Sequence, residues 1–234
     1  MSNGSYHLLQ VFREAFEGTV YKHRISTTGN KIGRELFEDL FRHTVSSLYT
    51  DNVRSGACIV SRGGGVHGKV IRRNDSVFGR PPAGLPGRKA APGYAVIEGT
   101  VAEPRIGCEV KILAKAQLKQ IDRVINDLEG FALRMKRLNK KCINAAVVGV
   151  NHEPNYVGFE GAREFRHRLR ADEPFVVMNR LGVLTASYDE VLLLSFKATN
   201  QPPFPFSWGG ARKVELDYAS VLTRIGEQYQ ERFR

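Results

Sequence analysis

The stretch Gly107-Cys108-Glu109-Val110-Lys111-Ile112-Leu113 decides the expected fold. Its β-branched and apolar residues predict a strand, in which residues two positions apart point to the same face of the sheet. Glu109 and Lys111 therefore project together, while Val110 and Ile112 turn into the core. A core strand rarely presents two charged side chains on one face, so this pair is the first candidate for a functional site.

The segments on either side of this strand predict its neighbours. Residues 94–101 form a second β-branched run, and the turn 102–105 separates it from the strand 106–113, which predicts a hairpin. Apolar residues then recur at spacings of three and four, which predicts a long amphipathic helix over 114–138. The apolar run 143–150 predicts a strand buried on both faces. This order indicates a β-helix-β connection and a mixed α/β fold.

The hairpin predicts a metal site. If it is symmetric about Glu103-Pro104, Glu98 lies opposite Glu109, and cross-strand partners share a face with Cβ atoms about 5 Å apart. Two carboxylates at that separation repel each other unless a divalent cation lies between them, and oxygen ligands suit Mg²⁺ or Mn²⁺. We therefore expect Glu98 and Glu109 to be metal ligands. Asp75 and Glu103 remain alternatives for the first acid.

Lys111 completes the expected chemistry. A metal ion polarises a phosphoryl oxygen and lowers the pKa of a bound water, and Lys111 would orient or deprotonate that water. Its ammonium group would also offset the negative charge that builds on the phosphate. This combination is typical of phosphodiester hydrolysis.

These pieces together resemble the PD-(D/E)XK superfamily of restriction-endonuclease-like nucleases. The resemblance covers about residues 30–150 and implies a mixed central sheet flanked by helices, with Mg²⁺-dependent DNA cleavage and Mn²⁺ as a substitute. It also implies a supporting acid on the early helix, where Glu38 lies nearer the apolar face and Glu35 is expected to point to solvent. The matching segments are Glu35-Leu36-Phe37-Glu38, Glu98 on the first hairpin strand, Glu109-Val110-Lys111 on the second, the helix 114–138 and the strand 143–150. Pro92-Gly93 stands where the superfamily often has Pro-Asp, so the first acid stays open.

The remainder of the chain is expected to complete one nuclease domain spanning 1–234. Short apolar runs predict strands at 175–178, 183–187 and 191–196. An aromatic and proline-rich loop follows at 202–208, and a closing helix is expected over 214–233.

The composition favours DNA as the partner. The 234 residues include 35 Lys and Arg against 24 Asp and Glu, a net charge of +11, which favours a polyanion. No apolar run approaches the roughly 20 residues that span a bilayer, and the N-terminus lacks the pattern of a secretory signal. We therefore expect no membrane insertion and a cytoplasmic protein. Cys58, Cys108 and Cys142 are too far apart for a close-spaced zinc set and are expected to be buried thiols.

Two other patterns compete with this interpretation. Gly63-Gly64-Gly65-Val66-His67-Gly68-Lys69 has the spacing of a phosphate-binding loop, but Val70 stands where Ser or Thr would hold Mg²⁺, so a glycine turn is expected instead. The basic cluster Arg163, Arg166, Arg168 and Arg170 fits either a phosphate contact or a solvated helix face.

The assembly and one alternative function stay open. Cutting both strands of a duplex usually takes two active sites, which favours a homodimer or a higher homo-oligomer. The alternative is a nucleic-acid-binding protein without catalysis, which the basic charge would explain equally well.

Overall fold

The computed structural model describes residues 6–22, 26–66, 69–70, 75–84, 89–160 and 163–234. Its helices are α1 (His7–Glu14), α2 (Ser26–His43), α3 (Ser47–Arg54), α4 (Gln117–Leu138), α5 (Glu173–Leu181) and α6 (Ala211–Phe233), with a 3₁₀ helix η1 (Gly182–Ala186). Its strands are β1 (Ile59–Val66), β2 (Lys69–Val70), β3 (Asp75–Arg80), β4 (Glu98–Val101), β5 (Glu103–Leu113), β6 (Ile143–Asn151), β7 (Asn155–Glu160), β8 (Arg163–Arg168), β9 (Glu190–Ala198) and β10 (Phe206–Trp208).

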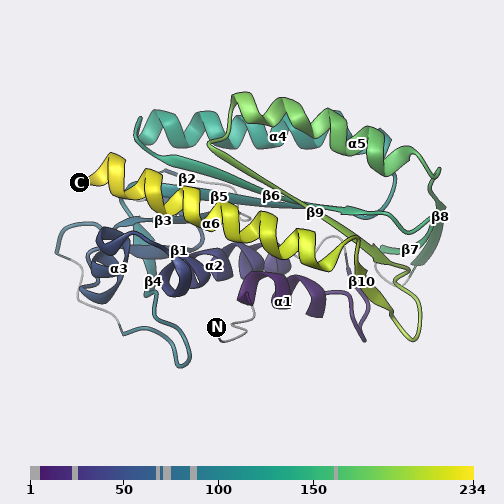
Figure 1. The fold of residues 1–234 in the computed structure, drawn as a ribbon, viewed down its shortest axis with the longest axis horizontal. Helices are drawn as coiled ribbons and strands as arrows, with labels where there is room; N and C mark the ends of the chain where they lie inside the picture. The colour runs from purple at the N-terminus through teal and green to yellow at the C-terminus, as the bar shows by residue number, and fades with distance from the viewer. Residues whose placement is uncertain (1–5, 23–25, 67–68, 71–74, 85–88, 161–162) are drawn as a thin grey trace.

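The described strands form a mixed central sheet. Seven of them follow the order β10-β9-β6-β5-β3-β1-β2, and an eighth, β4, pairs with β1. Strands β5, β6 and β9 are parallel to one another, whereas β3 and β10 run antiparallel at either side of them. Helices α4 and α5 cover one face of the sheet, and α1, α2 and α6 cover the other (Figure 1). The predicted α/β fold, a mixed sheet flanked by helices, is confirmed.

The β5-α4-β6 unit forms as its pattern predicts. Ile121, Val124, Leu128 and Met135 bury one stripe of α4 because they recur every three or four residues. All residues of β6 are buried, as expected for a parallel strand covered on both faces. Strand β9 lies next to β6 and alternates between buried positions and positions that are partly or fully exposed.

Helix α2 packs closely on the opposite face. A Cβ atom at Gly33 would lie 2.7 Å from Ser76 Oγ on β3, so the glycine lets the helix approach the sheet. Ile32, Leu36 and Phe37 of α2 are fully buried there, in a core shared with α1, α3 and α6.

Several short segments differ from expectation. The segment expected as a strand at 175–178 lies in α5, and 183–187 lies mostly in η1, because short apolar runs suit a helix as well as a strand. The basic cluster weighed as a helix face falls largely in strand β8, and the loop 202–208 ends in β10. In the described part of the chain, every helix is too short or too polar to cross a bilayer.

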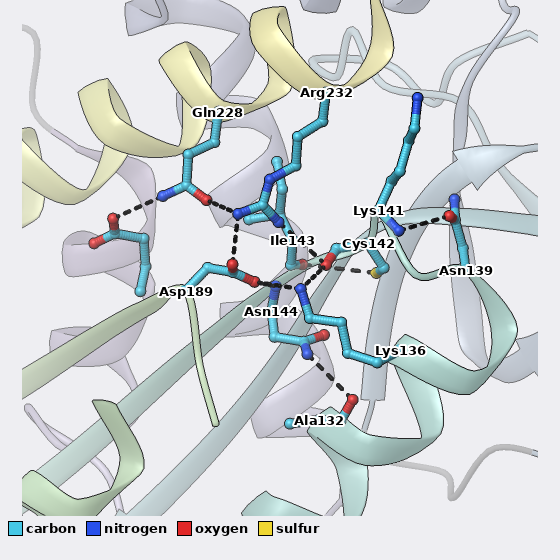
Figure 2. Close-up of polar contacts among 11 residues, drawn as sticks. Ala132, Lys136, Asn139, Lys141, Cys142, Ile143, Asn144, Asp189, Gln228 and Arg232 are labelled. Carbon is cyan, nitrogen blue, oxygen red and sulfur yellow. Dashed lines mark hydrogen bonds and ion pairs between the residues drawn. The ribbon is translucent and has the colours of Figure 1, made fainter. Parts of the chain in front are cut away.

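Asp189 ties three elements together near the start of β9 (Figure 2). Its carboxylate accepts hydrogen bonds from Arg232 of α6 at 2.6 Å, Lys136 of α4 at 3.1 Å and the backbone N–H of Asn144 in β6 at 2.8 Å. Burial opposes ionisation of Asp189, but these three donors outweigh it and hold the pKa of the carboxyl below its ordinary value. The two long helices are thereby fixed to the same corner of the sheet.

We expect Asp189→Asn to lower the free energy of unfolding by about 2 kcal/mol at neutral pH, because charge-assisted hydrogen bonds are lost. A carboxyl with a depressed folded pKa stabilises the protein above its unfolded pKa, and this contribution disappears as the pH falls through the folded pKa. The difference between wild type and variant should therefore shrink below the ordinary aspartate pKa of about 3.9. Urea unfolding of both proteins, at neutral pH and at pH values below the ordinary aspartate pKa, measures this difference in the free energy of unfolding. Asp217→Asn, which removes an exposed pair with Lys213, is the control and should change stability little. A difference in unfolding free energy that does not depend on pH would contradict stabilisation by the ionised Asp189 carboxylate.

Candidate active site

The two faces of β5 meet different helices. A Cβ atom at Gly29 of α2 would lie 4.0 Å from Val110 Cβ, whereas one at Gly107 would lie 2.8 Å from Met135 Cγ of α4. Glu109 and Lys111 follow Gly107 at two-residue intervals and therefore share the α4 face. The predicted projection of these two charged side chains from one face is confirmed.

Glu109 and Lys111 form a buried ion pair through Glu109 Oε1 and Lys111 Nζ. The Glu109 side chain is 4% exposed and that of Lys111 is 21% exposed. Burial raises the pKa of the Glu109 carboxyl, and the positive charge of Lys111 counteracts only part of that effect. Within the described residues, Glu109 Oε2 is buried and accepts no hydrogen bond. Lys111 thus engages one of the two carboxylate oxygens.

Helix α4 adds two charges that sequence reasoning missed. The positive charge of Arg134 favours ionisation of Glu109, and the negative charge of Asp127 opposes it. The signal was present in the sequence: Asp127 lies three residues after Val124 and immediately before Leu128, so it borders the buried stripe of the helix. The chemistry of this face therefore depends on α4 as well as on β5.

The predicted pairing of Glu98 with Glu109 is wrong. Strand β4 pairs with β1 in a parallel arrangement that sets Glu98 opposite Val60. Strand β5 has β3 on one edge and β6 on the other, so no edge remains for a hairpin partner. In the antiparallel β3–β5 pair, the backbone of Asp75 lies directly opposite Glu109. Glu98, Asp75 and Glu103 were the three candidates for the first metal-binding acid. Asp75 occupies the position opposite Glu109 that was expected for Glu98.

Glu98 belongs to a different environment, beneath α2. Its carboxylate forms an ion pair with Arg34, whose guanidinium carbon lies 3.5 Å from the ring centroid of Tyr94. These side chains line a pocket of about 340 Å³ together with Asn30, Lys31, Ser61 and Ser76. Because Ser76 and Gly33 meet on the α2 face, this pocket lies on the other side of the sheet from Glu109.

Glu103, the third acid considered, was expected in a turn but is the first residue of β5. It pairs with Arg80 of β3, at the end of the β3–β5 ladder away from Asp75 and Glu109. Its carboxylate lies 4.0 Å from the Arg80 guanidinium and is exposed. Glu103 therefore lies at the opposite end of the β3–β5 pair from the Glu109–Lys111 ion pair.

Glu38 has a structural use. Its two carboxylate oxygens accept hydrogen bonds from the backbone N–H groups of Ala95, at 3.0 Å, and Val96, at 2.8 Å, and the residue is fully buried. Neighbouring Glu35 accepts a hydrogen bond from the Tyr94 hydroxyl and is 1% exposed, whereas a solvent-facing side chain was expected. The structure therefore brings Glu38 to the loop before β4 and does not bring it to Glu109.

Amide, glycine and thiol groups outside the Glu109–Lys111 pair have their own places in the fold. Gln117 is buried and donates to the carbonyls of Leu113 and Asn151, which ties the start of α4 to the ends of β5 and β6. The glycines 63–65 of the phosphate-loop pattern lie in β1, while residues 67–68 fall outside the described residues. Cys58, Cys108 and Cys142 are buried free thiols, as expected. Among the residues that the structure describes, there is no group of three or more His, Cys, Asp or Glu side chains that could hold a metal ion.

No family model, no curated protein and no solved structure matches the chain.

Proposed function

We propose that this protein is a metal-dependent deoxyribonuclease of the restriction-endonuclease-like type. The observation that favours it most is the buried Glu109 carboxylate, which Lys111 engages through one oxygen while the other oxygen has no hydrogen-bond donor within the described residues. A buried carboxylate oxygen in that state is costly unless a cation or a donor reaches it. A hard divalent cation is the partner that suits carboxylate oxygens.

The order of elements supports the same proposal. An early helix, antiparallel strands ending in β5, helix α4 and the parallel strand β6 follow one another in the order that the resemblance implies. In the proposed site, Glu109 and Asp75 would hold the cation, because the backbone of Asp75 lies opposite that of Glu109 in the β3–β5 pair. Asp75 thus takes the role first expected of Glu98.

The chain's own residues have distinct proposed roles. Glu109 and Asp75 would supply the negative charge that holds the cation. A Mg²⁺ ion held there would act as a Lewis acid that polarises a phosphoryl oxygen and lowers the pKa of water. Lys111 pairs with the Glu109 carboxylate and favours its ionised form, and it would orient the attacking water and stabilise the charge that develops on the phosphate.

DNA is the proposed substrate, and the net charge of +11 supports a polyanion. A homodimer or a higher homo-oligomer is the proposed working unit, because cutting both strands usually takes two active sites. The size of the protein in solution, with and without DNA, tests that part separately.

Incubation of the full chain with supercoiled plasmid and linear duplex DNA tests the function. We expect cleavage in Mg²⁺ or Mn²⁺ and none in excess EDTA, with activity restored when the metal is returned. Intact DNA under every metal condition, together with measurable DNA binding, would favour the alternative of a nucleic-acid-binding protein without catalysis.

A further inference from the structure

A two-stranded hairpin extends from the end of the sheet that lies nearest Lys111. Strands β7 and β8 pair antiparallel and form a separate sheet, with Tyr156 opposite His167 and Val157 opposite Arg166. In the main sheet Lys111 pairs with Val148 of β6, and β7 begins a few residues after β6 ends. Figure 1 shows the hairpin beyond the ends of β6 and β9. The hairpin therefore lies at the same end of the sheet as Lys111.

The body of the protein holds the first strand of the hairpin firmly. Tyr156 and Val157 are buried, and the Val157 N–H donates to Thr199 O at 3.0 Å. The Asn200 side chain donates to Val157 O at 2.7 Å, and the Leu169 N–H donates to Pro154 O at 2.7 Å. An isolated hairpin is marginally stable in water, so these contacts let it act as a fixed arm.

The second strand is strongly basic and exposed. Arg163, Arg166 and Arg168 are all exposed on β8. Because the side-chain period of a strand is two, Arg163 faces one side of the hairpin, while Arg166 and Arg168 face the other. Glu164 is the acidic residue among them and lies 3.3 Å from Arg166. The arm therefore offers positive charge on both of its faces.

Lys115 links the arm to the candidate active site. A Cβ atom at Gly158 would lie 3.0 Å from Lys115 Cδ and 3.2 Å from His167 Nε2, so Lys115 lies against the hairpin. Lys115 follows Lys111 by four residues, in the segment between β5 and α4. Basic groups therefore extend from the candidate active site onto the arm.

We propose that the β7–β8 hairpin is a DNA-docking arm that holds the phosphate backbone next to Lys111. A two-stranded ribbon fits the major groove of DNA, and arginines on both faces can meet phosphates of both groove walls. A membrane partner fits less well, because the large apolar side chains that are exposed in the described structure all lie outside this hairpin. The inference deepens the proposed nuclease function and rests on it.

Binding measured without catalysis tests the arm separately from the nuclease. The full-length chain is titrated against a short fluorescein-labelled duplex in EDTA, at several salt concentrations. The arm variant replaces Arg163, Arg166 and Arg168 by Ala. We expect its affinity at low salt to fall at least about tenfold and the slope of log K against log salt to decrease by roughly 2 to 3, because each lost phosphate contact removes about one unit.

A matched control removes the same charge at the opposite end of α4. It replaces Arg137, Lys140 and Lys141, which are exposed, by Ala. The control should retain most of its affinity. A second variant, Glu164→Gln, removes a negative charge beside Arg166 and should raise affinity a few-fold, a gain that misfolding cannot produce.

The outcomes separate the two proposals. Unchanged binding by the arm variant, an equal loss in the control, or no duplex binding by the wild type would overturn the docking arm. Loss of binding to phosphatidylserine vesicles with duplex binding unchanged would also overturn it, in favour of a membrane contact. A docking arm confirmed in a protein that never cuts DNA would leave the arm in place and refute the nuclease.

Discussion

Lys111→Ala should lower the single-turnover rate of Mg²⁺-dependent DNA cleavage by about a thousandfold, while duplex binding in EDTA stays within a few-fold of wild type. The expected size follows from the loss of a group that handles a proton and stabilises developing phosphate charge, effects that are typically worth factors of about 10² to 10⁴. Binding should survive because most affinity comes from the other basic groups. Gel-based cleavage under enzyme excess and fluorescence anisotropy give the two values.

The design must separate chemistry from folding, because Lys111 is also the partner of a buried carboxylate. Removing it leaves the buried Glu109 carboxyl without its ion-pair partner, which lowers stability. The double variant Glu109→Gln with Lys111→Met replaces the ion pair by neutral side chains of similar size. It should regain stability relative to Lys111→Ala and remain inactive. Lys119→Ala, an exposed lysine on α4, is the matched control and should cleave normally. A Lys111→Ala protein that cuts within threefold of wild type would refute the proposed role.

The parts of the fold that the sequence predicted well are those with long periodic patterns. Helix α4 extends over many turns with a regular buried stripe, and β6 is a continuous apolar run, so local residues alone determine both. The alternation in β5 also predicted the shared face of Glu109 and Lys111. Each of these predictions required only residues that are neighbours in the chain.

Strand pairing was not predictable in the same way. The turn 102–105 favoured a hairpin between β4 and β5, yet β5 pairs with β3, which precedes it by a long segment rich in Pro and Gly. A strand's partner depends on which edges other strands occupy, and this is a property of the whole sheet. The error placed Glu98 instead of Asp75 opposite Glu109, but it did not affect the prediction that Glu109 and Lys111 share one face of β5.

Helix α5 illustrates a local ambiguity. The run Phe175-Val176-Val177-Met178 reads as a strand by its β-branched residues, but it follows Glu173-Pro174, a typical helix start with Pro at the first positions. A run of four apolar residues is too short to distinguish the period of a helix, about 3.6 residues, from the period of a strand, about two residues. The role of Glu38 could not be predicted from local sequence either. Its carboxylate accepts hydrogen bonds from the backbone N–H groups of Ala95 and Val96, which are distant in the sequence.

The two acids can be distinguished directly. Asp75→Asn should lower the rate of DNA cleavage by at least about 100-fold, because a lost metal ligand weakens the stabilisation of phosphate charge. Glu98→Gln should leave the rate within about threefold, because Glu98 pairs with Arg34 on the α2 face of the sheet. Both substitutions replace one carboxylate by an amide of nearly equal size, so each is the matched control of the other.

Mn²⁺ binding gives a second measurement that does not depend on cleavage. Titration calorimetry of the unmodified chain, the two single variants and Glu109→Gln should show weak or absent binding for Asp75→Asn and Glu109→Gln, and normal binding for Glu98→Gln. Asp75→Asn keeps the backbone N–H and C=O groups of the β3–β5 pair, so its circular dichroism should match that of the wild type. The reverse result, with Glu98→Gln inactive and Asp75→Asn active, would mean that the cation site lies beneath α2. In that case the pocket containing Arg34 and Tyr94, and not the Glu109–Lys111 pair, would hold the metal.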